Sequence, residues 1–211
     1  MKRRRVLGWM ASSVGANVLA PFTGGALAAA KLTTPGQMRG PFYPRKFPLD
    51  KDFDLTRVAG SDGVAFGEIA TVAGRVTDSD GQALEGVLIE IWQVNGYGRY
   101  HHEGDDSTNP IDPNFQGYGA VMTNAQGAYR FRTIKPIAYP GRAPHIHFAV
   151  APKKGAPLVT QMYLAGAREN AGDFLLAGIR DKAERESLIV SFEKNGNELI
   201  GTFDIVLPKP T

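Results

Sequence analysis

Cysteine is absent from this chain of 211 residues, and histidine occurs only four times. Without cysteine there is no disulfide bridge and no thiolate metal site, so a metal ion would have to bind through nitrogen or oxygen ligands. The length allows one domain with a buried core, alone or with appendages. The 25 glycines and 14 prolines favour a β-rich protein with many turns.

The chain also lacks a real excess of one charge. The formal net charge of +3 comes from the first 30 residues, which hold four basic residues and no acidic one. Without those four, 20 of the 24 basic residues remain against 21 acidic ones. A chain this close to neutrality gives no argument for a nucleic-acid partner.

No long, uninterrupted apolar run is present in residues 1–30, where an export signal is expected. A basic head precedes a weakly apolar stretch at 6–20, and ALAAA at 26–30 offers small residues for cleavage. Arg3-Arg4-Arg5-Val6-Leu7 resembles the twin-arginine signal. We therefore predict that 1–30 is a twin-arginine signal peptide and that the protein is periplasmic, with no stable membrane insertion after the signal is removed. An ordinary secretory signal and a membrane anchor are the alternatives.

The remaining chain reads as an irregular arm at 31–66 followed by a domain at 67–211. The domain alternates apolar and polar residues with a period of two, and turn residues separate the segments. This pattern predicts an antiparallel β-sandwich with long loops, the longest at 94–118, and one short helix at 179–188. The expected strands are 69–76, 87–92, 129–133, 145–150, 157–164 and 199–207.

Two of the four histidines, His145 and His147, lie one residue apart in one of these strands. Residues i and i+2 of a strand point to the same side, about 7 Å apart, so both imidazoles can bind one ion. The alternative is a pair of buried histidines that are hydrogen-bonded to the backbone or to water. The spacing alone leaves both interpretations open.

Two tyrosines near this pair could add oxygen ligands, which would allow a harder metal ion than two imidazoles alone favour. Tyr100 and Tyr139 could each supply a phenolate, a hard anionic ligand suited to ferric iron, and a bound cation lowers the pKa of a phenol. No carboxylate stands out as a third ligand. His101 and His102 are interpreted as solvated or pocket-rim residues. The carboxylates considered as alternative ligands are Glu90, Asp105, Asp106 and Asp112.

Several phrases, in order along residues 68–165, resemble the intradiol ring-cleavage dioxygenases, especially the protocatechuate 3,4-dioxygenase branch. They are EIWQ, GRY, DPNF, YRFRTIKP, HIHF and TQMY, and GPFYP at 40–44 resembles the family's N-terminal segment. The resemblance implies a catalytic β-sandwich with non-haem Fe(III). Such an enzyme cleaves an aromatic diol between its hydroxylated carbons with O2 and forms a muconate-type dicarboxylic acid.

The resemblance also assigns roles to residues. Tyr100, Tyr139, His145 and His147 match the metal ligands, and Tyr139 matches the one that leaves the metal and acts as a base when substrate binds. Arg142 matches an arginine that stabilises charge on the substrate, and Gln161 matches a polar residue of the same pocket. Tyr97 and Tyr118 are further candidates for lining the substrate pocket, with packing as the alternative.

The chain departs from the family pattern just before the histidines. It has Arg142-Ala143-Pro144 where the family has R-P-A, and only Pro140 and Gly141 separate Tyr139 from Arg142. This short link puts the aim of Arg142 and the identity of the diol in doubt. A non-catalytic transthyretin-like binding module and a zinc hydrolase are the alternative functions. Family members are often oligomeric, and the arm at 31–66 could wrap a neighbour or its own domain.

Overall fold

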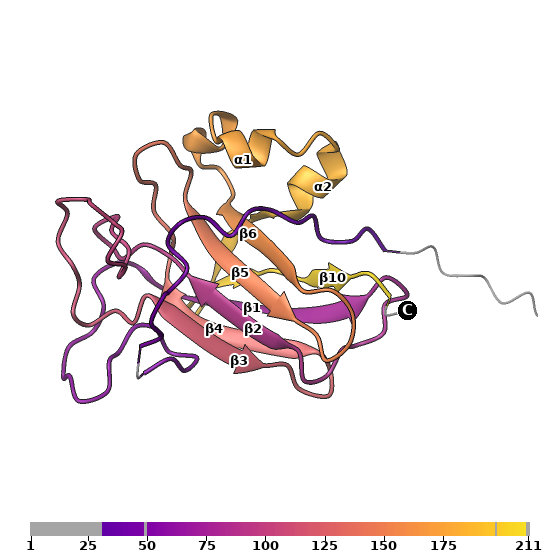
Figure 1. Ribbon diagram of the computed structural model, residues 1–211, viewed down its shortest axis with the longest axis horizontal. Helices are drawn as coiled ribbons and strands as arrows, with labels where there is room; N and C mark the ends of the chain where they lie inside the picture. Colours follow the sequence, from indigo (N-terminus) through magenta and orange to yellow (C-terminus); the bar gives the residue numbers. More distant parts are fainter. Residues whose placement is uncertain (1–30, 49, 197, 210–211) are drawn as a thin grey trace, which may run out of the picture.

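The segments that alternate apolar and polar residues form two five-stranded sheets (Figure 1). The structure is a computed structural model, and it describes residues 31–48, 50–196 and 198–209. One sheet has the order β10-β1-β9-β8, with β4 paired to β1, and its strands are β1 (Ile69–Asp78), β4 (Ala128–Ile134), β8 (Phe192–Asn195), β9 (Glu198–Thr202) and β10 (Ile205–Leu207). The other has the order β3-β2-β5-β6-β7, and its strands are β2 (Leu88–Trp92), β3 (Tyr118–Met122), β5 (His145–Ala151), β6 (Leu158–Leu164) and β7 (Ile189–Val190).

The main core lies between the two sheets. Val72 and Phe131 of the first sheet and Ile89, Ile146 and Phe148 of the second belong to it, and all five are completely buried. Because successive side chains of a strand point to opposite faces, the residues between these apolar ones face away from the core. This rule places His145 and His147 on the outer face of the second sheet.

Strand register brings three candidate site residues and Trp92 into one row on that outer face. Trp92 of β2 pairs with Tyr118 of β3 on one side and with His147 of β5 on the other. His147 in turn pairs with Gln161 of β6. The sheet therefore fixes the order Tyr118, Trp92, His147, Gln161 across adjacent strands, about 4.8 Å from one strand to the next.

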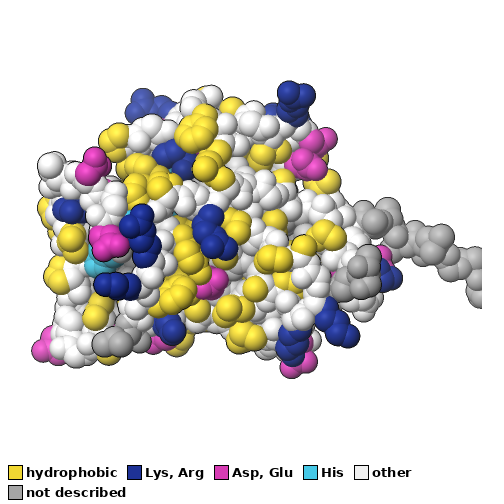
Figure 2. All heavy atoms as spheres, viewed as in Figure 1, with side chains coloured by type: hydrophobic (Ala, Val, Ile, Leu, Met, Phe, Trp, Pro, Cys, Tyr) yellow, Lys and Arg dark blue, Asp and Glu magenta, His cyan; other side chains and the backbone are white. Residues whose placement is uncertain are grey.

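The arm at 31–66 covers this outer face, and in Figure 1 its indigo segment crosses in front of β5 and β6. The amide of Gln37 donates to the carbonyl of Val159 (2.8 Å), and further along, Leu55 is buried in the main core. Figure 2, seen from the same side, shows Lys and Arg side chains spread among hydrophobic ones on this face. The arm thus forms one wall of whatever site the outer face holds.

The helical part of the chain differs from the sequence prediction. The single expected helix at 179–188 is shorter, α2 (Lys182–Ser187), and two elements precede it: η1 (Arg168–Ala171) and α1 (Phe174–Ala177). Aspartates at the N-caps define both α-helices, because Asp173 accepts from the amides of Leu175 and Leu176 and Asp181 accepts from that of Glu184. Four residues are too few for helical periodicity to show in a sequence.

The β-sandwich prediction is confirmed, but the sheets are not purely antiparallel. Strand β1 runs parallel to β9 and β10, and β6 runs parallel to β7. The expected strand at 199–207 is divided into β9 and β10, and both halves pair with β1. A hairpin turn joins β8 to β9, since Asn195 pairs with Glu198 and Gly196 adopts φ +62°.

Within the described part of the chain, no helix combines the length and the apolar character needed to cross a membrane. The predicted signal peptide at 1–30 lies outside the described residues.

Candidate metal centre

Three buried donor atoms converge on the outer face of the second sheet. The hydroxyl oxygen of Tyr100 lies 3.0 Å from Nε2 of His147 and 3.4 Å from Nε2 of His145, and the two Nε2 atoms are 3.2 Å apart. The three side chains are at most 3% exposed. Loop 94–118 supplies the phenol and strand β5 supplies both imidazoles, so residues far apart in the sequence form one compact triangle.

Each imidazole is held in a fixed orientation by a different contact. Nδ1 of His145 lies 2.6 Å from the carbonyl of Ala143, which makes Nδ1 the donor and leaves the lone pair of Nε2 facing the triangle. The ring of His147 stacks on Trp92 at 4.7 Å with only 7° between the planes. Burial lowers the pKa of His145 to about 4, with a further effect of the nearby Arg142 charge, so its imidazole is neutral at neutral pH.

The phenol of Tyr100 is neutral in this environment unless a cation is present. Burial raises its pKa well above the usual value of 10.0, and the neighbouring phenol of Tyr139 raises it further. Burial also lowers the pKa of His147 well below its usual value, and the proximity of His145 adds to this effect. The triangle therefore contains neutral ligands that are poorly solvated, and a bound cation would favour ionisation of the phenol.

Tyr139 stands beside the triangle on a less buried side. Its ring is 5.7 Å from that of Tyr100, edge to face, and 5.6 Å from that of His145. It is half-buried, whereas Tyr100 is packed against Phe42 of the arm at 4.6 Å. The two tyrosines thus differ in their surroundings: Tyr100 is buried and stacked on Phe42, and Tyr139 is partly exposed.

Arg142 and Gln161 lie together next to the triangle. Nη2 of Arg142 donates to Oε1 of Gln161 (2.5 Å), and Nε donates to the carboxylate of Asp173 (2.8 Å). Burial alone would lower the pKa of Arg142, but the hydrogen bond to Asp173 outweighs this effect and raises it. The site therefore carries one permanent positive charge, and this charge contributes to the low pKa values of both histidines.

The spacing of the triangle fits a single metal ion. Ligand atoms bound at about 2.1 Å and roughly 90–100° apart lie about 3.0–3.2 Å from each other, close to the separations observed here. No group of three His, Cys, Asp or Glu side chains that could hold a metal exists among residues 31–48, 50–196 and 198–209. A metal at this site would therefore depend on tyrosine oxygen, which favours a hard trivalent cation over zinc.

The structure does not bring the other predicted residues to the triangle. Tyr97 is exposed and stacks on Phe66 at 4.5 Å, and Tyr118 donates its hydroxyl to Glu90. Glu90 also accepts from Tyr43 at 3.0 Å. These contacts favour packing for Tyr97, which was the alternative to a place in the substrate pocket. Tyr118 lines a pocket of about 120 Å³ together with Tyr100 and Trp92, so a place beside the site stays a prediction for it.

The remaining candidate carboxylates have structural partners or face solvent. Asp105 accepts the amide of Tyr100 (2.7 Å), which helps to fix that residue at the triangle. Asp112 accepts the amide of Phe66 at 2.7 Å, and Asp106 is exposed. None of the three acts on the triangle as a ligand in this arrangement.

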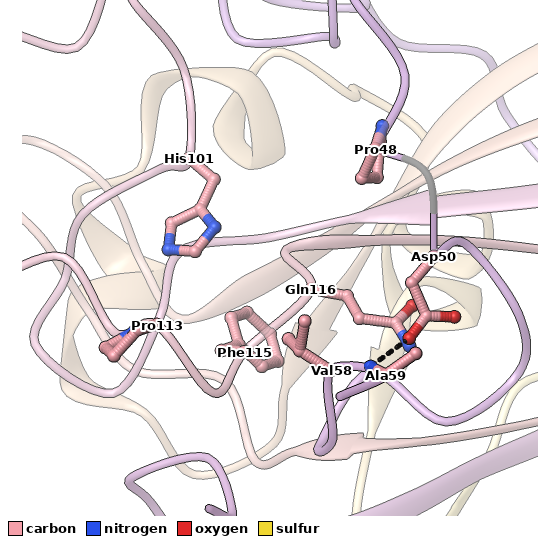
Figure 3. Close-up of a pocket in the computed structure, with 8 residues that line it drawn as sticks. All are labelled: Pro48, Asp50, Val58, Ala59, His101, Pro113, Phe115 and Gln116. Carbon is pink, nitrogen blue, oxygen red and sulfur yellow. Dashed lines mark hydrogen bonds between the residues drawn. The ribbon is translucent and has the colours of Figure 1, made fainter. Parts of the chain in front are cut away.

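His101 belongs to a separate cavity of about 520 Å³ rather than to the triangle (Figure 3). In the close-up its ring lies across the cavity from Asp50, whose carboxylate accepts the amide of Ala59 at 2.6 Å. The other lining residues include Phe115 and Gln116. His101 also lines a smaller pocket of about 120 Å³ together with Tyr100 and Trp92, so its interpretation as a pocket-rim residue agrees with its position.

Three residues that contact the site were missed by reasoning from sequence: Trp92, Phe42 and Asp173. Trp92 could have been found from its place two residues after Glu90 on the outward face of a strand, next to the strand of the histidines. Phe42 lies in the phrase GPFYP, which was noted for its resemblance alone. Asp173 gave only the signal of an N-cap before a short apolar run, which does not indicate a contact with Arg142.

Comparison with known proteins identifies the family. The family model described as Dioxygenase matches residues 38–209. The chain belongs to the intradiol ring-cleavage dioxygenases. It is 44% identical over 168 residues to the protocatechuate 3,4-dioxygenase beta chain of Burkholderia cepacia, and the match covers 74% of this chain and 71% of that one.

Two further matches share less of their sequence with this chain. The catechol 1,2-dioxygenase of Candida albicans is 29% identical over 157 residues, which cover 64% of this chain and only 48% of the relative. Among solved structures, the dioxygenase domain of a dioxygenase–carbohydrate-binding fusion from Streptomyces sp. SirexAA-E is 32% identical, with a TM-score of 0.65. That match covers 83% of this chain and 98% of the solved one.

Proposed function

We propose that this chain is a non-haem ferric dioxygenase that cleaves an aromatic 1,2-diol between its two hydroxylated carbons. The observation that carries the proposal is the buried triangle of one tyrosine oxygen and two histidine nitrogens, 3.0–3.4 Å apart. Tyr100, His145 and His147 would hold the ion, and Tyr139 would complete the set from its half-buried side. Ferric iron, when bound, supplies a Lewis acid that withdraws electron density from a chelating diol and makes its ring reactive toward O2.

The different burial of the two tyrosines suits different roles. Tyr100 is 3% exposed and stacked on Phe42, so it stays in place while other groups move. Tyr139 starts the short link to Arg142 and is followed by Gly141, whose φ is +81°. Tyr139, once ionised beside a bound cation, would therefore be the side chain whose phenolate oxygen takes a proton from a binding diol.

Arg142, held by Gln161, would stabilise negative charge on the substrate rather than transfer protons. The guanidinium stays protonated, because its hydrogen bond to Asp173 overcomes the effect of burial and raises its pKa. A fixed positive charge in a site shielded from water stabilises negative charge that develops on the substrate. Gln161 accepts from Arg142 at 2.5 Å and so limits where the guanidinium can lie.

The geometry favours the enzyme over the two alternative functions. A non-catalytic binding module has no need for buried imidazoles and a phenol in mutual contact, because unpaired polar groups cost free energy in an interior. A zinc hydrolase would need a third nitrogen or carboxylate ligand, and the described part of the chain offers no such group. The diol itself belongs to the class that the names of the relatives define: protocatechuate, catechol and hydroxyquinol.

The test is reconstitution of the purified protein with ferric iron, followed by oxygen uptake with those three diols. We expect a visible charge-transfer band from iron-bound tyrosine, uptake of one O2 per diol, and both atoms of labelled O2 in the dicarboxylic product. Tyr129→Phe serves as the control, because Tyr129 is a buried tyrosine whose hydroxyl donates to the carbonyl of Phe203 and not to the triangle. A colourless protein that binds zinc in equal amount and consumes no oxygen would refute the proposal.

We also propose that residues 1–30 direct export by the twin-arginine route, which places the enzyme in the periplasm. The basis is the sequence RRRVL at 3–7 and the small residues at 26–30. Replacement of Arg4 and Arg5 by lysine keeps the charge and should retain the protein in the cytoplasm, as measured by cell fractionation. Equal export of both forms would indicate the ordinary secretory route instead.

A further inference from the structure

Asp173 is a buried carboxylate that receives an unusual number of N–H groups. Its Oδ2 accepts from Nε of Arg142 (2.8 Å) and from the amide of Ala143 (2.9 Å). Its Oδ1 accepts from the amides of Leu175 and Leu176, each at 3.1 Å. The side chain is completely buried, so one carboxylate joins the first turn of α1 to the link that precedes the histidines.

The contact with Arg142 is the strongest restraint on that guanidinium. The Arg142 side chain is only 11% exposed, and its other polar partners, Gln161 and Tyr163, are neutral groups at 2.5 and 3.4 Å. The ring of Phe174, next to Asp173, lies 5.5 Å from the guanidinium carbon. Hydrogen bonds between two charged groups are about twice as strong as those between neutral groups, so Asp173 dominates the orientation.

The same carboxylate is also linked to the imidazole of His145 through the backbone of Ala143. It accepts the amide N–H of Ala143, and the carbonyl of Ala143 lies 2.6 Å from Nδ1 of His145. The short link 140–144 is thus held at its centre by an aspartate that comes 30 residues later in the chain. The contacts of Asp173 therefore orient Arg142 even though the link that precedes it is short.

We propose that Asp173 is a positioning residue that aims the guanidinium of Arg142 at the substrate. The inference rests on the proposed function, because it concerns the charge that Arg142 offers to a bound diol. Asp173 does not touch the triangle; it acts through Arg142, whose Nε it holds. The segment that begins at Asp173, including α1, is therefore part of the catalytic apparatus although it contributes no ligand.

The test is Asp173→Asn with Asp181→Asn as the matched control. Asn is as good an N-cap as Asp, so the cap of each helix survives. At 173 the amide oxygen takes the place of Oδ1 and keeps the cap of α1, so the amide NH2 takes the place of Oδ2 and faces the N–H groups of Arg142 and Ala143, which lose their acceptor. At 181 the carboxylate accepts only the amide of Glu184, with no arginine attached. Asp173→Ser, another good N-cap, replaces Asp173→Asn if the latter does not fold.

The first readout needs neither iron nor substrate. Hydrogen exchange of the Nε–H of Arg142, followed by NMR on the metal-free protein, should accelerate at least about 10-fold in Asp173→Asn and remain unchanged in Asp181→Asn. Equal exchange rates in the wild type and Asp173→Asn would overturn the inference. This readout is independent of whether the protein proves to be a dioxygenase.

The second readout is turnover per bound iron. We expect Asp173→Asn to lower kcat about 10- to 100-fold, with KM nearly unchanged, because the charge matters mainly in the transition state. In an Arg142→Ala background the same substitution should cause no further loss. An additional loss in that background, or wild-type turnover in Asp173→Asn, would refute the inference while the dioxygenase stands. Absence of turnover in the wild type would instead refute the proposed function.

Discussion

Replacement of Tyr100 by phenylalanine removes one buried oxygen and nothing else. In the metal-free protein this oxygen lies 3.0 Å from His147 and 3.4 Å from His145, and the two imidazoles keep their own contact at 3.2 Å. A net hydrogen bond contributes about 0.5–1.5 kcal/mol, and the variant no longer has to bury a hydroxyl. We therefore expect the free energy of unfolding to change by less than about 1.5 kcal/mol.

The effect on iron binding is expected to be much larger, because Tyr100 supplies an anionic ligand. A ligand that binds only the folded state stabilises it by about 2.7 kcal/mol when its free concentration is 100 times Kd. If Tyr100→Phe raises Kd about 100-fold, the same concentration equals Kd and the gain falls to about 0.4 kcal/mol. The assay is urea unfolding with and without ferric iron, whose free concentration is set by a weak chelator.

Tyr129→Phe provides the comparison for this assay. It also removes a buried tyrosine hydroxyl, which donates to the carbonyl of Phe203 on the other side of the sandwich. We expect it to lower the unfolding free energy in the absence of iron and to keep the full gain on iron addition. A full gain in Tyr100→Phe would show that Tyr100 is not a ligand, and a large destabilisation of the iron-free variant would assign it a structural role.

Three further perturbations address the surroundings of the site. Phe42→Ala removes the ring stacked on Tyr100 at 4.6 Å and should lower the unfolding free energy by about 1–3 kcal/mol in urea; no change would show that the arm does not hold Tyr100. Burial and then Glu90 raise the pKa of Tyr43 to about 12, so Glu90→Gln should move this pKa back toward 10.0 in an absorbance titration; an unchanged pKa would assign the whole shift to burial. Burial would raise the pKa of Asp173, but hydrogen bonds from Arg142 and backbone amides outweigh it and hold the pKa below 3.8. The wild type should therefore lose stability as the pH falls below that value, and Asp173→Asn should lose less in urea unfolding compared between about pH 4 and pH 2; equal losses would contradict the assignment.

The sequence predicted the parts of the site that strand geometry determines. His145 and His147 share a face because residues i and i+2 of any strand do, and the structure brings both Nε2 atoms within 3.2 Å. Tyr100 was predicted from the resemblance of GRY, and its contact with the histidines follows from how loop 94–118 folds back. Neither composition nor periodicity contains that information, because loop paths depend on contacts such as the one between Asp105 and the amide of Tyr100.

Other features depend on contacts between distant segments and could not be predicted from local patterns. The parallel pairing of β1 with β9 joins residues about 130 positions apart, and an alternating pattern looks the same in parallel and antiparallel edges. Tyr97 lies three residues before Tyr100 in the sequence, yet its ring stacks on Phe66, whereas the more distant Tyr118 packs in the same buried cluster as Tyr100. Proximity along a long loop is a weak guide to proximity in space.

The short link at 140–144 shows how a departure from a family pattern can be compensated. From the sequence, moving proline one position later and leaving only two residues after Tyr139 made the direction of Arg142 uncertain. In the fold, Asp173 holds both the guanidinium and the amide of Ala143, so the arginine keeps a defined position despite the altered link. Selectivity for the diol would then depend on the space left above this link and on the arm residues that cover it. If so, a substitution at Pro140, which leaves the contacts of Ala143 with Asp173 and His145 in place, should change which diol is preferred while leaving iron binding intact, and an unchanged order of preference would contradict this role of the link.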